Sequence, residues 1–387
     1  MRRALMVLLV ALFTTVGANA TTTDYVHVRI VDVGAALCCL IELPDNHYMI
    51  YDAGYNEQAT QEDQAAARAA ILAQLPDIIP ENSTIDLLVV SHHHADHMNA
   101  ISDIFESGRG YQLGRLLENG YDRNGQDADW LEEFHTIQRS GDFQHLTLVD
   151  ESGTVRLAEI SHENNENEGE EGSEPELTVL EPPVGHGDFL PFCDELGVNL
   201  RILAGWPAPQ WADATSGNPN ETSVVLKLEF AGRSILFPGD STGRVNHASV
   251  NQIRYAENCM VTNHETGDQR YSLDADVLVA GHHGSDGSTS TAFVQAVTPQ
   301  YVIFASGHQY QHPSAATAER CCNNGVERIN IFRTDWGDDE TDYDDPNATC
   351  SEWDWGRHCQ AYHDPPGDDN VDIWIYENGY LGVNYAY

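Results

Sequence analysis

The chain has 387 residues, of which 41% are hydrophobic and 9% aromatic, enough apolar material for one large domain or two smaller ones. This composition excludes a disordered chain, a collagen-like fibre and a disulfide miniprotein. Asp and Glu number 61 against 19 Lys and Arg, so the formal net charge is -42, and Lys227 is the only lysine. We therefore do not expect a free-standing basic nucleic-acid-binding module, because no cation patch is large enough to release counterions from a polyanion.

The first twenty residues have the pattern of a secretory signal peptide. Arg2 and Arg3 form a basic start, an apolar stretch covers 4–17, and residues 18–20 read Ala-Asn-Ala, a cleavage signal. The apolar stretch is shorter than the ~20 residues that a membrane-spanning helix needs. We expect a mature protein that begins at Thr21, is secreted or periplasmic and has no membrane anchor. Loss of the two arginines would take its net charge from -42 to -44.

Eight cysteines follow the signal, and an even number in an exported chain predicts disulfides. No C-x-x-C pair is present, which disfavours a thiolate metal site. Neighbouring residues of a strand point to opposite faces, so Cys38 and Cys39 are expected to have different partners. The sequence does not choose among the pairings. The cysteines are Cys38, Cys39, Cys193, Cys259, Cys321, Cys322, Cys350 and Cys359.

Strands and helices alternate along the mature chain, which is typical of an α/β fold. An Ala-rich helix is expected over 64–75 and is ended by Pro76. The continuous apolar run 85–90 predicts a strand buried on both faces, followed by a helix that starts near His97. A second helix is expected over 129–138. The remaining predicted elements are strands over 25–32, 39–43, 47–51, 177–180, 198–203, 223–230, 234–237, 275–280, 301–304, 371–376 and 380–385.

Two acidic stretches interrupt this pattern. The composition becomes rich in Glu, Asn and Gly between Glu159 and Glu176, and we interpret 158–176 as an acidic surface insertion. The run from Asp335 to Asp345 lacks the D-x-D-x-D-G order of a calcium loop and is interpreted as a solvated loop. We divide the mature chain into one domain over 21–320 and a Cys/Trp-rich C-terminal extension over 321–387. This extension is expected to pack on the same domain and to be braced by disulfides.

The most specific motif follows the buried strand directly. His92, His94, Asp96 and His97 have the spacing H-x-H-x-D-H. A strand that stops at a tight loop can aim these four side chains at two adjacent points. Imidazole and carboxylate groups are ligands that a borderline cation such as Zn²⁺ prefers. The sequence therefore predicts metal binding at this strand end.

Three further motifs also follow predicted strands. They are Asp52-Ala53-Gly54, Pro238-Gly239-Asp240 and Gly281-His282-His283-Gly284-Ser285. An aspartate after a strand is by itself most often a turn residue. All four motifs in this order, each at a strand end, form a specific combination.

This combination resembles that of the metallo-β-lactamase superfamily of binuclear metal hydrolases. Within it, the match is closest to the branch that includes the external hydrolase domain of ComEC-type DNA-uptake proteins. The resemblance spans about residues 25 to 320 and implies an αββα sandwich with the metals in a cleft at one edge of the two sheets. The matching segments are Val31-Asp32-Val33-Gly34, Asp52-Ala53-Gly54, His92 to His97, Asn220-Glu221-Thr222-Ser223, Pro238-Gly239-Asp240, His282-His283-Gly284-Ser285 and His312-Pro313.

The resemblance also implies roles for single residues, carried over by position. Two divalent ions are expected, Zn²⁺ first and Mn²⁺ as the alternative, and Asp52 is implied to orient the ligand loop. Superfamily members supply one more histidine to the first ion, whereas this chain has Asn220 there. His186 is a candidate substitute, with a solvated loop histidine as the alternative. The implied ligands are His92 and His94 for the first ion, Asp96, His97 and one of His282 and His283 for the second, with His283 favoured, and Asp240 as the bridge between them.

The implied activity is hydrolysis by a metal-bridging hydroxide, because two bound ions lower the pKa of water from about 15.7 toward about 7. Asp96 would act as a catalytic ligand. His312, or the unliganded His282, would hold a phosphoryl oxygen or protonate the leaving group. A structural cap beside Pro313 is the alternative for His312. Asn220 and Ser285 are expected as hydrogen-bond donors to substrate.

Three functions follow from this site. The first is a secreted phosphodiesterase or nuclease-like enzyme acting on a small-molecule or nucleotide-type phosphoester. The acidic surface opposes a stable nucleic-acid complex at low salt. The second keeps the metals and hydrolyses a lactone, a carboxylic ester or a sulfate ester. The third is a non-catalytic binding protein on a degenerate fold, which an intact metal-free protein would favour.

Overall fold

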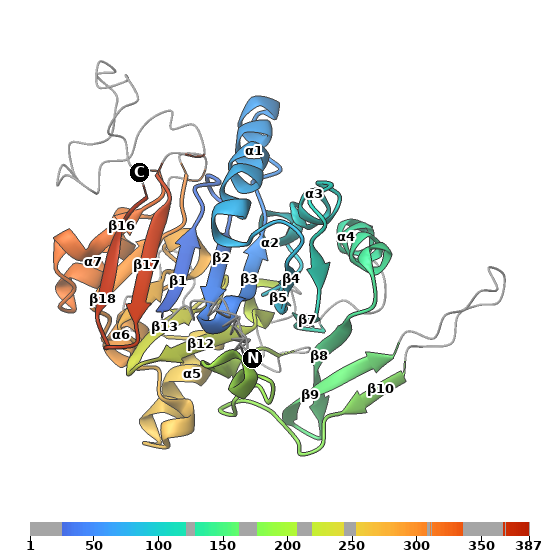
Figure 1. Cartoon of the computed structure of the whole chain (residues 1–387). Helices are drawn as coiled ribbons and strands as arrows, with labels where there is room; N and C mark the ends of the chain where they lie inside the picture. Colours follow the sequence, from blue (N-terminus) through green and yellow to red (C-terminus); the bar gives the residue numbers. More distant parts are fainter. Residues whose placement is uncertain are drawn as a thin grey trace, which may run out of the picture.

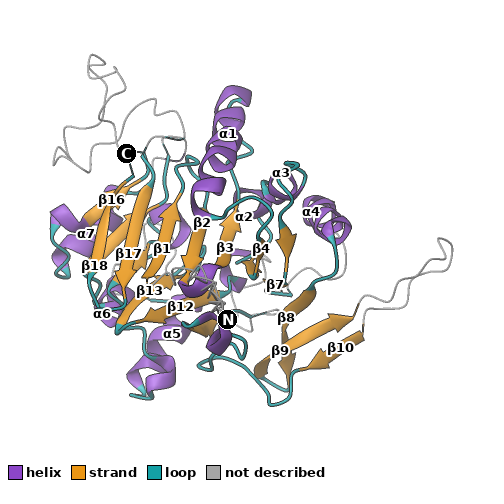
Figure 2. Cartoon of the chain, in the orientation of Figure 1, coloured by secondary structure: helices purple, strands orange, loops and turns teal. Residues whose placement is uncertain are grey.

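The computed structural model describes residues 25–120, 128–161, 176–206, 219–243, 253–307, 310, 312–335, 367 and 369–386. These residues form two large β-sheets packed face to face, with helices on both outer faces (Figures 1 and 2). The predicted α/β fold with an αββα layer order is therefore confirmed.

The first sheet has ten strands in the order β10-β9-β8-β7-β5-β3-β2-β1-β17-β18. Its centre is parallel, because β3, β5, β7 and β8 run in the same direction. The strands are β1 (Tyr25–Ile30), β2 (Cys38–Leu43), β3 (His47–Ala53), β5 (Leu87–Val89), β7 (Arg115–Glu118), β8 (Gln144–Glu151), β9 (Thr154–Ser161), β10 (Glu176–Val179), β17 (Val371–Tyr376) and β18 (Leu381–Tyr385).

The second sheet has six strands in the order β11-β12-β13-β14-β15-β16, and its last four strands are parallel. A further short pair, β4 (Thr84–Ile85) and β6 (Gln112–Leu113), lies outside both sheets. The strands of the second sheet are β11 (Asn199–Ala204), β12 (Val225–Phe230), β13 (Arg233–Phe237), β14 (Val277–Val279), β15 (Tyr301–Phe304) and β16 (Ile331–Arg333).

Helices cover the outer faces of both sheets. Residues of α1, α3 and α4 share one apolar cluster with the first sheet, and residues of α5, α6 and α7 share another with the second. The helices are α1 (Gln61–Ile78), α2 (Ala95–Met98), α3 (Ile101–Phe105), α4 (Ala128–Ser140), α5 (Tyr255–Glu265), α6 (Thr291–Val297) and α7 (Ala315–Asn323).

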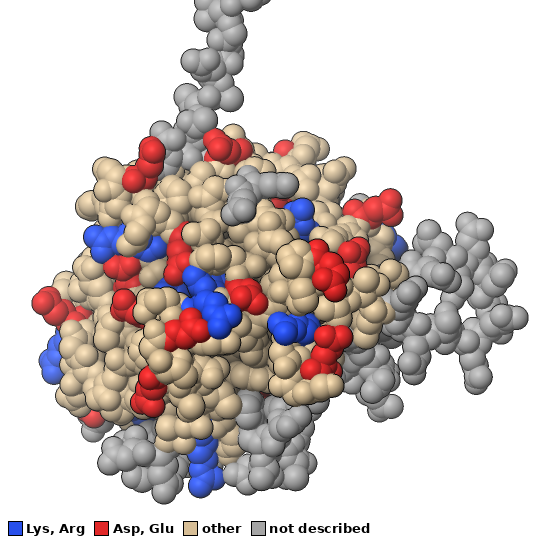
Figure 3. All heavy atoms as spheres, turned by 90° about the horizontal axis from the view of Figure 1, so that it is seen from below, with Lys and Arg blue, Asp and Glu red and all other residues tan. Residues whose placement is uncertain are grey.

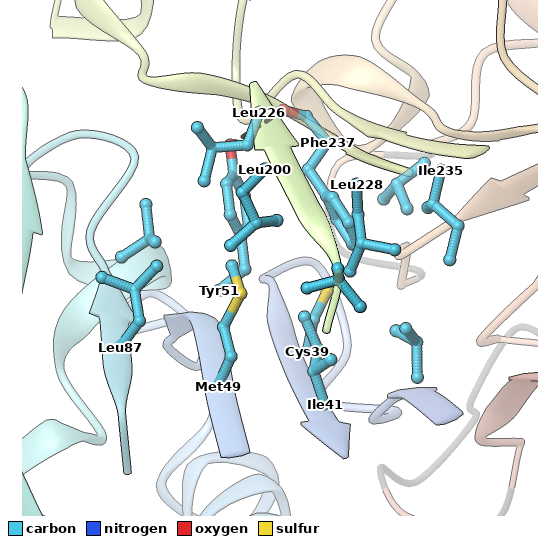
Figure 4. Packing of buried hydrophobic residues seen from close by; sticks show 14 of the residues in the cluster. Cys39, Ile41, Met49, Tyr51, Leu87, Leu200, Leu226, Leu228, Ile235 and Phe237 are labelled. Atoms are coloured by element: carbon cyan, nitrogen blue, oxygen red, sulfur yellow. Dashed lines mark hydrogen bonds between the residues drawn. The ribbon is translucent and has the colours of Figure 1, made fainter. Parts of the chain in front are cut away.

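The core between the sheets positions the site. Figure 4 shows side chains of β2, β3 and β5 facing those of β11, β12 and β13. Tyr51 crosses this core, and its hydroxyl donates to the carbonyl of Val224 at 2.6 Å. Tyr51 and the ring of Phe237, which is in contact with it, are fully buried. Because Asp52 follows Tyr51 and Pro238 follows Phe237, this packing fixes two of the predicted motifs relative to each other.

The helix expected over 64–75 is longer, because Pro76 lies inside α1 rather than at its end. Proline has no N–H to bond the carbonyl four residues earlier, which here belongs to Leu72. That carbonyl accepts a hydrogen bond from Arg109 Nη1 at 2.5 Å instead. The side-chain donor replaces the missing backbone donor, and the helix continues to Ile78.

The strand expected over 85–90 is divided into β4 and β5 at Asp86. The carboxylate of Asp86 accepts the backbone N–H of Tyr48 at 2.8 Å and lies 3.2 Å from His47 Nδ1. These contacts anchor Asp86 at the start of β3. Only the second half of the apolar run then joins the first sheet, as β5.

No disulfide joins any two of the six cysteines in the described part of the chain. The prediction of opposite faces for Cys38 and Cys39 is confirmed, since Cys38 packs under the helices and Cys39 packs between the sheets. The expected disulfides therefore do not form among these six, and the four buried sulfurs lie in apolar clusters instead. Cys350 and Cys359 lie outside the described residues.

The described part of the C-terminal extension is held by strand pairing. Strand β17 pairs with β1 along its whole length, with Trp374 opposite His27, and β18 pairs with β17. Strand β16 forms the edge of the second sheet. Asp335, the first residue of the second acidic run, is buried and paired with Arg333 rather than solvated. The rest of that run lies outside the described residues.

Strands β9 and β10 pair antiparallel, with Ser161 opposite Glu176. The chain therefore leaves the sheet before residues 162–175 and returns to it after them at a neighbouring position. Those residues and the predicted signal peptide lie outside the described residues. Among the helices described, none combines the length and hydrophobicity required to cross a membrane.

Candidate metal centre

The predicted motifs meet at one edge of the sandwich, where β3, β5, β13 and β14 end. A cleft of about 260 Å³ opens there. Its described lining includes seven of the predicted site residues, which are His94, Asp96, Asn220, Asp240, His282, His283 and His312.

The segment after β5 contains four predicted ligands close together in the sequence, His92, His94, Asp96 and His97. Strand pairing stops at Val90, whose N–H donates to Leu117, and Ser91 then accepts the N–H of Val224 from the second sheet at 2.8 Å. His94 keeps an extended backbone and precedes the single turn of α2. Because Asp96 and His97 lie in that turn, they point to the same edge as the loop residues before them.

Asp52 contacts this loop at two points. Its carboxylate accepts the backbone N–H of Ser91 at 2.6 Å and lies 2.7 Å from His97 Nδ1. Burial raises the pKa of Asp52, although the contacts with His97 and Ser91 oppose this effect. Its backbone is left-handed, with φ of 56°, a strained conformation for a residue with a side chain. The Asp52 contact assigns the Nδ1 proton of His97 and leaves Nε2 facing Asp240.

Asp240 lies at the centre of the site. It follows β13 through Gly239, which has φ of 53°, and its backbone N–H donates to Ser223 Oγ at 3.1 Å. Burial alone would raise the pKa of Asp240, but the nearby His97, His282 and His283 hold it well below the ordinary value. Asp240 is therefore an ionised carboxylate within a group of histidines.

His282 and His283 reach this carboxylate from the loop after β14. Both have left-handed backbones, with φ of 49° and 54°. His283 Nδ1 lies 3.0 Å from the carbonyl of Ala305, which fixes the ring, and its Nε2 is 3.5 Å from Asp96 Oδ2. The pKa of His283 is raised, because the Asp240 and Asp96 carboxylates outweigh the effect of burial.

Among the predicted ligands, three buried atoms make no hydrogen bond to any described residue, although the first and the last lie 3.1 Å apart: His97 Nε2, His283 Nε2 and Asp240 Oδ1. Buried polar atoms without partners are costly and rare. A divalent cation would satisfy all three, and imidazole nitrogen with carboxylate oxygen is a donor set suited to Zn²⁺. Two groups of potential ligand atoms each lie within 4.8 Å of one another, namely His92 with His97 and Asp240, and Asp96 with His97 and His283. These residues fit a divalent metal.

His312 lines the cleft, and its Nδ1 is buried without a hydrogen bond to a described residue. Burial and the neighbouring His283 and His282 lower the pKa of His312 to about 3. Its ring is therefore neutral near pH 7. A neutral imidazole can donate a hydrogen bond to a substrate oxygen, but it does not carry the extra proton that a general acid delivers.

Ser285 and His186 lie away from the open cleft. Ser285 is buried, and its Oγ is 3.1 Å from His282 Nδ1, so it contacts a histidine rather than a substrate. His186 Nε2 is 2.8 Å from the carbonyl of Gly205, and its ring packs edge-on against Trp206. Because its Nε2 is taken up by this backbone carbonyl, His186 does not replace the missing histidine.

Sequence reasoning missed several residues that build the cleft. Asn56, Glu57, Gln58 and Tyr310 line it, and Ser223 links the Asp240 backbone to the loop of Asn220. The first three follow the Asp52 motif after one intervening residue, Tyr55. A general expectation that loops after strand ends line the site would have found them. Tyr310 lies two residues before His312, outside any motif.

Comparison with known proteins agrees with this geometry. The family model described as "Metallo-beta-lactamase superfamily" matches residues 31–308. The chain belongs to the metallo-β-lactamase superfamily. That match covers all the predicted ligands and ends just before His312.

Two curated relatives are similar to part of the chain. Competence protein ComA of Neisseria gonorrhoeae is 32% identical over 118 residues, which is 30% of this chain and 14% of that protein. ComE operon protein 3 of Bacillus subtilis strain 168 is 28% identical over 154 residues, 39% of this chain and 16% of that protein. The chain thus matches less than a fifth of the length of either relative.

Among solved structures, the metallo-β-lactamase fold protein YhfI of Bacillus subtilis is similar at 11% identity and a TM-score of 0.41. The similarity covers 80% of this chain and 96% of that one.

Proposed function

We propose that this chain is an exported, metal-dependent hydrolase of phosphodiesters. The observation that carries the proposal is the position of Asp240, an ionised carboxylate with histidines of two loops around it, at the floor of an open cleft. Membership of the superfamily and the similarity to ComA and ComE operon protein 3 support the same choice.

The chain's own residues would hold two divalent ions, Zn²⁺ first and Mn²⁺ as the alternative. Bound ions of this kind act as Lewis acids and lower the pKa of water to about 7. Asp96 and Asp240 supply negative charge, the histidines supply neutral nitrogen ligands, and Asp52 orients His97. His312 and Asn220 are the side chains of the cleft with which a phosphoryl oxygen would form hydrogen bonds.

The charge of the cleft favours a small substrate over a long polyanion. No lysine or arginine is among the described residues that line the cleft, whereas Glu57, Asp96 and Asp240 are. On the face shown in Figure 3, Lys and Arg are interspersed with Asp and Glu and form no continuous basic tract. Nucleic-acid binding gains most of its affinity from phosphate contacts with cations. We therefore infer a nucleotide-sized phosphoester as the substrate.

Turnover of bis(p-nitrophenyl) phosphate tests this function. The mature protein would be assayed in moderate salt with added Zn²⁺ or Mn²⁺, beside Asp96→Ala. Turnover that the variant lacks supports a metal-dependent phosphodiesterase. A protein that binds neither metal and has no turnover would contradict the proposal.

A neutral lactone or carboxylic ester, or a sulfate ester, is the second candidate class. The acidic lining of the cleft favours the neutral substrates of this class, because carboxylates repel an anionic substrate but not a neutral one. This class is indicated if the protein binds metal and hydrolyses such an ester while bis(p-nitrophenyl) phosphate remains intact.

A further inference from the structure

The carboxylate of Asp240 lies between two pairs of histidines, one pair at each oxygen. Oδ1 is 3.1 Å from His97 Nε2 and 3.6 Å from His283 Nε2. Oδ2 is 3.5 Å from His282 Nε2 and 3.9 Å from His92 Nε2. The adjacent residues His282 and His283 therefore face different oxygens of one bridging carboxylate.

Each half of this arrangement has one further potential ligand. On the Oδ1 side, Asp96 Oδ2 is 3.5 Å from His283 Nε2. On the Oδ2 side, His94 Nδ1 is 2.9 Å from His92 Nε2. Each half thus offers three side chains in addition to Asp240, which is the number a four-coordinate Zn²⁺ site needs.

The surroundings of His282 suit a ligand. Ser285 Oγ lies 3.1 Å from Nδ1, so the hydroxyl can accept the Nδ1 proton and leave Nε2 to bind a cation. Asn220, which occupies the place of the superfamily's additional histidine, lies with its Nδ2 3.2 Å from His282 Nε2. The two side chains therefore reach the same point from opposite loops.

We propose that His282 is a ligand of the first ion and takes the place of the histidine that is absent at position 220. His283 then belongs to the second ion, and His282 has no part in proton transfer. This assignment rests on the two-metal centre of the proposed function. It does not depend on the identity of the substrate.

Metal content tests the assignment without an activity assay. The purified protein would be loaded with Co²⁺, dialysed, and measured by elemental analysis and by the visible absorption of the bound ion. We expect two ions per wild-type chain and one in His282→Ala. His312→Ala, which removes a cleft histidine outside the ligand set, is expected to retain two.

A second variant tests the position rather than the mere loss of a side chain. Asn220→His combined with His282→Ala should restore binding of the first ion and return the total to two ions per chain, because the new imidazole approaches the same point from the opposite loop. Circular dichroism would establish that each variant is folded. Two ions bound by folded His282→Ala with unchanged affinity would overturn the assignment, as would fewer than two ions in the wild type. Two ions in the wild type without phosphodiester turnover would contradict the proposed substrate and leave the assignment intact.

Discussion

His97 Nδ1 lies 2.7 Å from the carboxylate of Asp52, and both groups are completely buried. The carboxylate also accepts the backbone N–H of Ser91. One side chain at the end of β3 therefore fixes both the start of the histidine loop and the orientation of a predicted ligand. Contacts of this kind raise the basicity of a ligating histidine and set its tautomer.

Replacing Asp52 should weaken metal binding more than it changes the fold. In Asp52→Asn, the shape is kept but the negative charge beside His97 is lost, so we expect metal affinity to fall about 10- to 100-fold. Isothermal titration with Zn²⁺ measures this change. Asp276→Asn is the matched control. The carboxylate of Asp276 also accepts a backbone N–H, that of Ser234, but Asp276 lies at the end of the second sheet opposite to the site. Equal affinities in Asp52→Asn and wild type would refute the orienting role.

Gly54 allows the Asp52 loop and the histidine loop to touch. A Cβ at this position would overlap the backbone of Asp96 and His97. Since backbone atoms cannot rotate away, Gly54→Ala must separate the two loops. We expect loss of metal binding and a lower free energy of unfolding, by about 1–3 kcal/mol for overpacking. Gly382→Ala is the control, because the three atoms nearest to its Cβ all belong to the side chain of Tyr380, the first at 3.3 Å. Chemical denaturation with and without Zn²⁺ measures both effects, and wild-type metal affinity in Gly54→Ala would count against the close approach.

The ligand loops could be predicted because each follows a strand of recognisable hydrophobic pattern. Apolar runs before His92, Asp240 and His282 place these motifs at strand ends, and parallel strands bring such ends to one edge. The αββα layers are expected from the family resemblance that these motifs carry, whereas the apolar runs by themselves predict only an α/β fold. What the pattern lacks is the relation between distant segments. Nothing in the sequence around Leu72 indicates that Arg109 would supply the hydrogen bond that lets α1 continue through Pro76.

The cysteines also show that a sequence pattern does not determine contacts between distant segments. An even number in a chain with a signal-like start predicts disulfides from compartment alone. The fold instead distributes the four buried cysteines among three apolar clusters, where a thiol packs as a small hydrophobic group. The pairing of β17 with β1 joins positions more than 340 residues apart in the chain, as the Arg29–Asp372 contact shows, and no local pattern encodes it.

Thiol labelling should distinguish the cysteines by burial. Cys259 and Cys322 are half-buried, whereas Cys38, Cys39, Cys193 and Cys321 are buried. Burial raises the pKa of Cys321 to about 12 and that of Cys39 well above the ordinary value, so their reactive thiolates are scarce.

We therefore expect iodoacetamide to modify Cys259 and Cys322 in the native protein, and the other four only after unfolding. Peptide mass mapping before and after denaturation checks this order. Peptides of Cys38 or Cys39 that are cross-linked to another cysteine would show disulfides and contradict the free-thiol arrangement.

A buried glutamate should make the protein more stable in mild acid. Glu257 is 1% exposed, and its carboxylate accepts the backbone N–H groups of Thr289 and Ser290 at 2.5 and 2.9 Å. Burial raises the pKa of Glu257 from 4.5 to about 7. Between these values the native state binds more protons than the unfolded state. The contribution of Glu257 to stability is therefore complete below about pH 4.5 and is lost as the pH rises through about 7.

The difference between these two pKa values corresponds to a free energy on the order of 3 kcal/mol. In Glu257→Gln no proton is released, so the decline in unfolding free energy from pH 5 to pH 8 should be smaller than in wild type by about this amount. Urea denaturation at pH 5, 6, 7 and 8 measures it, with Glu377→Gln in the exposed β17–β18 turn as the control. Glu221, whose pKa burial also raises to about 7, keeps some pH dependence in the variant. If the unfolding free energies of variant and wild type differ by the same amount at every pH from 5 to 8, the Glu257 carboxylate remains ionised in the native state. Its two N–H donors and the nearby Arg320 would then stabilise the charge.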